Sequence, residues 1–215
     1  MTGSTGVESR GMPVGRMEAL TDGVLAIVMT LLVLLIEPPS AGLSDERLHH
    51  VLLEDWHMFI SYVISFALLC LYWWRHHILF HYLNRSDGVL TVLNLLFLFC
   101  TALIPFPTAL LVEYFGTPDA EIAVLIFGGV NLVCAGVLAS MWLYATRQQR
   151  LVKDALGAVA TRRLLESTIA SLIVYLMAII TSFFSPTLAL FLFFLVPLLH
   201  ILPRYIVTHE VVLGE

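Results

Sequence analysis

The chain has 215 residues, of which 59% are hydrophobic and 13% charged, and its formal net charge is −5. About a quarter of the residues of a soluble domain are charged, so this composition excludes an ordinary soluble protein and indicates an integral membrane protein. The sequence carries no basic patch for nucleic acid, and its three cysteines lie inside apolar runs, which is typical of packed thiols and not of disulfides.

The chain begins with a polar segment, residues 1–15, which is rich in Gly and Ser and is expected to be a flexible cytoplasmic tail. It lacks the basic start and short apolar core of a signal peptide, so we expect the first apolar span to be retained. Six apolar stretches follow, each near the length that a bilayer requires. They cover about residues 16–36, 57–80, 87–111, 120–146, 164–182 and 186–206. The sequence thus predicts an all-α fold, with a six-helix membrane domain over 16–206 and a cytoplasmic tail at 207–215.

The first span combines an apolar helix with a few polar groups. Residues 16–36 would form a helix about 32 Å long, enough to cross a bilayer. At about 100° per residue, one face collects a set of seven side chains. The set is Arg16, Leu20, Gly23, Ile27, Thr30, Leu31 and Leu34. Asp22 lies well off this face and should point to protein or water, because an unpaired carboxylate in a membrane is costly. The seven-residue face can line a narrow pore or pack against neighbouring helices.

The later spans and their connections set the topology. Proline at positions 105, 107 and 197 predicts kinks in the third and sixth spans. With the N-terminus in the cytoplasm, ten of the eleven Lys and Arg residues lie on the cytoplasmic side and only Arg47 faces outward. The positive-inside rule and the even number of spans therefore place both termini in the cytoplasm.

Several motifs resemble those of one channel family. They are Arg16-x-x-x-Leu20-Thr21-Asp22 with Gly-Val-x-Ala-Ile and Thr-Leu-Leu-Val-Leu after it, Trp73-Trp74-Arg75-His76-His77, Asn94, and Pro105-Phe106-Pro107. The first is similar to the Arg-x-x-x-Phe-Ser-Asp signature of the bacterial relatives of the lysosomal potassium channel transmembrane protein 175. Leu20 replaces the aromatic residue and Thr21 replaces Ser, with the hydroxyl kept. The resemblance covers residues 12–205.

The resemblance implies a homotetramer in a bacterial cell membrane, with the first helix of each chain lining a central pore. Potassium-preferring cations would cross this pore passively. Rings of Ile27, Leu31 and Leu34 would form a hydrophobic constriction, and a ring of Thr30 hydroxyls would favour potassium. The alternative for Thr30 is a hydrogen bond to the carbonyl of Ala26 or Ile27, with no role in the pore.

The polar residues at the start of the first helix predict a motif network of Arg16, Thr21 and Asp22. Candidate partners at the same depth are Arg75, His76, His77 and Asn94. The sequence alone does not choose between the histidines, and the resemblance points to His77. The alternative is a capped helix start with interfacial charges.

No motif for catalysis or metal binding stands out. His77 and His81 have a spacing that zinc sites use, but no further ligand pair follows. The sequence lacks a nucleophile elbow, a phosphate loop and the Thr-Val-Gly-Tyr-Gly filter of other potassium channels. We therefore predict no enzyme, cofactor or metal, and partners limited to potassium ions, lipid and further copies of the chain. The main alternative function is a proton-coupled secondary transporter that uses Asp22 and the histidines, and a third is a structural membrane protein.

Overall fold

The computed structural model describes residues 12–38, 53, 56–147, 151–152 and 158–212, so most of the predicted N-terminal tail lies outside the described residues. The helices are α1 (Val14–Leu31) with the 3-10 turn η1 (Leu32–Leu35), α3 (Trp56–Tyr82), α4 (Gly88–Ala102), α5 (Pro105–Tyr114), α6 (Ala120–Thr146), α7 (Ala158–Ser182) and α8 (Pro186–Val212). Within this part of the chain, five spans are long and apolar enough to cross a membrane, and Pro186–His200 is a shorter apolar helix. The all-helical membrane fold predicted from the sequence is confirmed, and helices occupy all six predicted spans.

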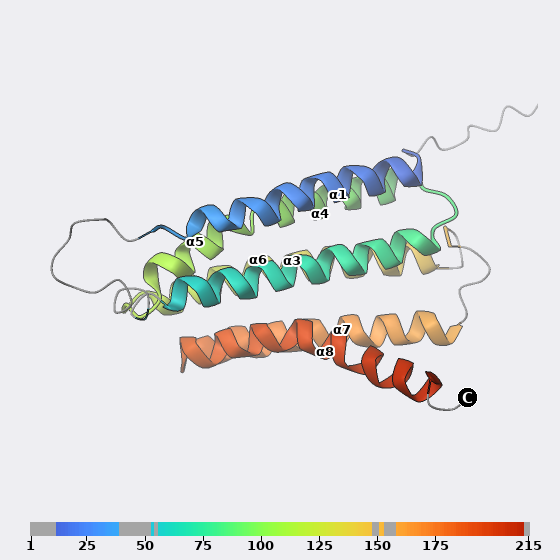
Figure 1. Ribbon diagram of the computed structural model, residues 1–215. Coiled ribbons are helices and arrows are strands. Elements are labelled where there is room, and N and C mark those ends of the chain that lie inside the picture. Colours follow the sequence, from blue (N-terminus) through green and yellow to red (C-terminus); the bar gives the residue numbers. More distant parts are fainter. Residues whose placement is uncertain (1–11, 39–52, 54–55, 148–150, 153–157, 213–215) are drawn as a thin grey trace, which may run out of the picture.

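The helices lie side by side in a bundle (Figure 1). α1 packs on α3 and α4, α6 packs on α4, α5 and α7, and α8 packs on α7 and α3. The start of α1 and the end of α8 lie at the same end of the bundle. The apolar composition of these helices explains the arrangement, because their backbone polar groups are satisfied internally and their side chains can face either protein or lipid.

The third span is broken near its outer end, where the sequence predicts a kink. α4 ends at Ala102 and α5 begins at Pro105. Proline has no amide hydrogen and its ring crowds the preceding turn, so it disrupts a continuous helix. The amides of Leu103 and Ile104 instead donate to carbonyls three residues back, at 3.2 and 3.1 Å. In the sixth span, α8 is continuous through Pro197 and is bent in Figure 1.

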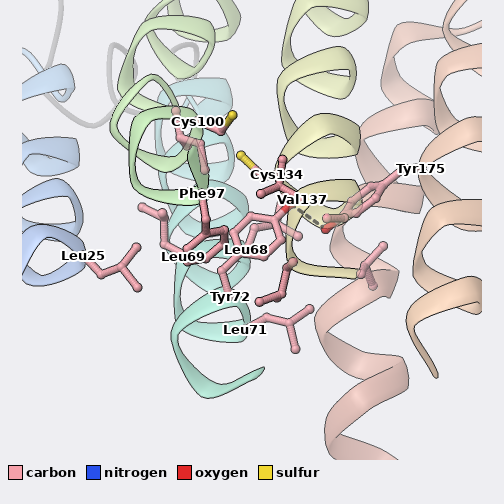
Figure 2. Packing of buried hydrophobic residues seen from close by; sticks show 14 of the residues in the cluster. Leu25, Leu68, Leu69, Leu71, Tyr72, Phe97, Cys100, Cys134, Val137 and Tyr175 are labelled. Atoms are coloured by element: carbon pink, nitrogen blue, oxygen red, sulfur yellow. Dashed lines mark hydrogen bonds between the residues drawn. The ribbon is translucent and has the colours of Figure 1, made fainter. Parts of the chain in front are cut away.

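The core between the helices is apolar and close-packed. Figure 2 shows Leu25 of α1 beside α3, with Leu69 of α3 and Phe97 of α4 in the same layer. Cys100 and Cys134 are buried in this core, and Cys70 is half-buried. All three are free thiols, as the sequence predicts. The buried side of α1 is therefore anchored against α3 and α4.

One polar cluster lies inside this core. The Tyr72 hydroxyl is 3.0 Å from the Asn131 carbonyl oxygen, 3.1 Å from Asn131 Oδ1 and 3.0 Å from the Tyr175 hydroxyl. Asn131 Nδ2 donates to the carbonyl oxygen of Phe127 at 2.9 Å. These contacts satisfy polar groups that would otherwise be costly in an apolar interior, and they link α3, α6 and α7.

Candidate functional site

The two sides of α1 have different surroundings. The side chains that face the bundle are buried, and they recur at helical spacing: Met17, Thr21, Leu25, Val28 and Leu32. The opposite side carries the predicted pore residues, of which Leu34 lies in η1, the turn that follows α1. Ile27 is 60% exposed, Leu31 44% and Leu34 70%. All three therefore lie on a face that no described helix of the same chain covers.

Thr30 is exposed between these residues, and its hydroxyl has a partner within its own helix. Thr30 Oγ1 donates to the carbonyl oxygen of Ile27 at 2.8 Å. This is the local hydrogen bond that the sequence left as the alternative to a pore role. The bond uses the hydroxyl proton, whereas a cation would contact the oxygen lone pairs, and a hydroxyl has two. The geometry therefore accommodates both roles.

Thr21 is joined to α3 and α4 by a buried hydrogen-bond network. Asn94 Nδ2 donates to Thr21 Oγ1 at 3.2 Å, and His76 Nε2 lies 2.8 Å from Asn94 Oδ1. Because the amide oxygen accepts, His76 carries its proton on Nε2 in this arrangement. The His76 ring is stacked between Phe80 and Phe97, with centroids 4.0 and 5.6 Å away. The network fixes the rotation of α1 about its own axis.

His76 is thus the histidine that reaches the Thr21–Asn94 pair. His77, to which the family resemblance points, contacts α1 at another residue. Its Nδ1 lies 3.1 Å from Glu18 Oε1. Neighbouring residues on a helix point about 100° apart, so the two histidines necessarily contact different groups. The sequence reasoning did not single out Glu18, although its position four residues before Asp22 places both acids on one side of α1.

Asp22 contacts α3 through Trp73. Trp73 Nε1 donates to Asp22 Oδ1 at 2.9 Å, and the carboxylate is otherwise exposed in the single chain. The Trp73 ring stacks on His77, with centroids 5.9 Å apart and planes inclined by 19°. This contact gives the Trp73 indole N–H an acceptor and the Asp22 carboxylate a donor. It therefore favours one register of α1 on α3.

Arg16 and Arg75 do not join these contacts. Arg16 is exposed, and among the described residues its guanidinium pairs with no carboxylate. Arg75 is buried and points toward α7 and α8, where Nη1 lies 3.1 Å from Ser171 Oγ and 3.3 Å from His200 Nε2. Its Nη2 contacts Thr168. The structure therefore brings Thr21, Asp22 and Asn94 to the α1–α3–α4 contact and separates both arginines from it.

Acidic and thiol groups do not gather into a metal site in the described part of the chain, where no group of three or more His, Cys, Asp or Glu side chains is placed to hold an ion. The contacts at α1 are hydrogen bonds and one acid–imidazole pair. They position a helix whose exposed residues from Ile27 onward are apolar except for Thr30.

Known proteins similar to this chain are membrane channels. The family model described as "Endosomal/lysosomal potassium channel TMEM175" matches residues 16–105. A potassium channel of Streptomyces collinus is 38% identical over 149 residues, 69% of this chain and 72% of that protein. A potassium channel of a Chryseobacterium species is 30% identical over 196 residues, 89% of this chain and 94% of that protein.

One solved structure is similar in both sequence and fold. It is that of a lysosomal potassium-selective channel TMEM175 homolog from Chamaesiphon minutus, with a TM-score of 0.79 and 31% identity. The match covers 88% of this chain and 97% of that chain. The family model's residues 16–105 contain α3, α4 and α1 from Arg16 onward, and hence the predicted pore residues and motif residues.

Proposed function

Because the chain belongs to the TMEM175 family of potassium channels, we propose that it conducts cations passively across a membrane and prefers potassium. The observation that carries this proposal is the exposed apolar face of α1. Its apolar residues Ile27, Leu31 and Leu34 are 60%, 44% and 70% exposed, while the other side of the helix is buried. The stretch from Ile27 to Leu34 carries no charged side chain, which suits a narrow conduction path.

One chain supplies one α1, which cannot enclose a pore by itself. We propose a homotetramer in which four copies of α1 surround the axis, because closed cyclic symmetry buries the same face in every copy. Ile27, Leu31 and Leu34 would then form three apolar rings that control wetting. Thr30 would add a ring of oxygen atoms between them, which can replace part of the hydration shell of potassium.

The motif network would hold α1 in this orientation. Thr21 and Asn94 contribute through buried hydrogen bonds, and Asp22 and His77 through contacts that join α1 to α3. Arg16 is exposed at the start of α1, where it can reach lipid headgroups or a neighbouring copy. These are positioning roles, and none of them requires contact with the permeating ion.

The proposed setting is a bacterial cell membrane with both termini in the cytoplasm. Ten of eleven basic residues favour this orientation. Within the proposed organisation, residues 1–15 and 207–215 are cytoplasmic tails and 16–206 is the channel domain. α8 remains helical to Val212, so the helix would continue past the membrane surface.

Purified protein in liposomes tests the function directly. Potassium efflux should follow the imposed voltage and require no second ion, and sodium should pass less readily. Ile27→Asn should raise the flux and weaken the discrimination between the two ions, because a polar ring admits water to the constriction. Uphill uptake driven by a proton gradient would instead establish a transporter, and absence of flux in well-assembled protein would leave a structural role.

A further inference from the structure

Two contacts link the edges of α1 and α3 at the end of the bundle where α1 starts and α8 ends. Glu18 and Asp22 lie four residues apart on α1, and Trp73 and His77 lie four residues apart on α3. Glu18 Oε1 is 3.1 Å from His77 Nδ1, and Trp73 Nε1 donates to Asp22 Oδ1 at 2.9 Å. Side chains four apart on a helix are neighbours, so the two contacts are adjacent.

The Glu18–His77 contact can change strength with pH. Histidine is the side chain whose charge normally changes between pH 5 and 8. A neutral imidazole with its proton on Nδ1 donates an ordinary hydrogen bond to the carboxylate. A protonated imidazole makes a charge-assisted bond that is roughly twice as strong. The pair is partly exposed in the single chain, with side-chain exposures of 29% for Glu18 and 46% for His77.

Protonation would strengthen the second contact as well. The Trp73 indole stacks on the His77 ring at a centroid distance of 5.9 Å. A cation over an indole face is attracted by the negative face of the ring, and this attraction is absent for neutral imidazole. Because the same indole donates to Asp22, a charged His77 would tighten both links between α1 and α3.

The other charged and titratable groups near His77 do not contact it in place of Glu18. From α1, the only further charges near this end are Asp22, which bonds Trp73, and the exposed Arg16. On α3, Arg75 points to Ser171 and His200, and the buried His76 faces Asn94, the neutral amide that α4 contributes. His81, one turn farther along α3, lies against Tyr82. Glu18 is therefore the carboxylate in direct contact with His77.

We propose that Glu18 and His77 form a titratable latch that positions α1, so that protonation from the cytoplasmic side tightens α1 on α3 and reduces conduction. The inference rests on the proposed channel function. In the present arrangement Ile27, Leu31 and Leu34 share the exposed face of α1, so a tighter latch keeps these apolar side chains toward the pore axis. A partly exposed acid–imidazole pair of this kind corresponds to about a two- to fivefold effect on an equilibrium.

The test is a recording of potassium current through reconstituted full-length protein in planar bilayers. The cytoplasmic-side pH is stepped from 8 to 6 while the outer pH and the potassium concentrations stay fixed. The current should fall about two- to fivefold in the unsubstituted protein. Glu18→Gln and His77→Gln should each remove most of this response, and the double variant should lose no more than either single variant.

Two further variants separate the latch from a general structural effect. The exchanged pair, Glu18→His with His77→Glu, restores an acid–imidazole contact with the roles reversed and should regain the pH response. His81→Gln removes a neighbouring histidine of α3 and should keep it. A conducting protein without pH response, or single variants that retain it, would overturn the latch. Absence of current in every protein would refute the channel function itself, and the latch with it.

Discussion

At the scale of single residues, the side chains around α1 divide into two groups. Some hold the helix against the bundle, and others remain available to a partner or an ion. Thr21, Asn94 and His76 are almost completely buried and bonded to one another. Ile27, Thr30 and Leu34 are exposed, and Thr30 bonds a carbonyl of its own helix. This division supports a helix that is anchored on one side and functional on the other.

Asn94 is the residue whose loss should loosen α1 most. Asn94→Leu keeps the approximate size of the side chain but leaves Thr21 and His76 buried without their partner. Each unsatisfied buried group costs about 1–3 kcal/mol, so we expect a lower Tm in detergent. Thr101→Val is the matched control on α4, because Thr101 bonds only carbonyls of its own helix, at 3.0 and 3.1 Å. Equal Tm values for the two variants would show that the network does not anchor α1.

Thr30→Val isolates the chemistry of the hydroxyl, because valine keeps the shape of threonine. If the oxygen contributes to selectivity, reversal potentials under potassium and sodium gradients should move toward each other while assembly stays normal. The loss of the bond to the Ile27 carbonyl should be nearly neutral for stability, since that bond lies within one helix and is solvent-exposed. Full potassium preference in the variant would assign Thr30 to the local bond alone.

At the scale of helices, the packing of α6 against α7 and α8 depends on a glycine. A Cβ atom at Gly128 would lie 2.7 Å from Ile179 Cγ1 and 2.8 Å from Phe193 Cζ. Small residues allow membrane helices to approach closely, and this close approach substitutes for a hydrophobic driving force between helices. The absence of a side chain at Gly128 therefore allows α7 and α8 to pack closely on α6.

Gly128→Ala should accordingly destabilise the bundle by about 1–3 kcal/mol through overpacking, seen as a lower Tm. Gly129→Ala is a control one residue away, where a Cβ meets nothing within 4 Å. That variant should be neutral or slightly stabilising, because alanine favours a helix over glycine by about 0.5–1 kcal/mol. Similar effects of the two substitutions would mean that the helices separate to admit the methyl group at little cost.

At the scale of the whole molecule, hydropathy alone predicted the helical membrane fold and the free cysteines, because the bilayer demands long apolar spans and buries thiols among them. The choice between His76 and His77 was not predictable. It depends on the rotation of α3, and both histidines belong to one apolar span. Glu18 was missed for the same reason, since its contact with His77 depends on the register of two helices that lie far apart in sequence.

Two residues of the motif on α1, Thr21 and Asp22, do contact α3 or α4. Thr21 and Asn94 lie in one buried network, and Asp22 lies beside it on Trp73. The roles of Arg16, Thr30 and the three apolar pore residues remain predictions, since each depends on neighbouring copies of the chain.

The tetramer is the assumption on which the pore depends, and the exposed end of α1 provides a way to test it. Leu34 is 70% exposed in η1, the turn that follows α1, so four copies around an axis would bring four Leu34 side chains together. In a background with Cys70, Cys100 and Cys134 replaced by Ser or Ala, Leu34→Cys should be joined between chains by a short thiol-reactive cross-linker in membranes. Ile180→Cys is the control, because Ile180 is 54% exposed near the C-terminal end of α7, on a helix that does not pack on α1. Cross-linked dimers for Leu34→Cys and none for Ile180→Cys would support a central α1, because only residues near the axis stay within reach of their own copies. The reverse pattern would place α7 at the axis and require another conduction path.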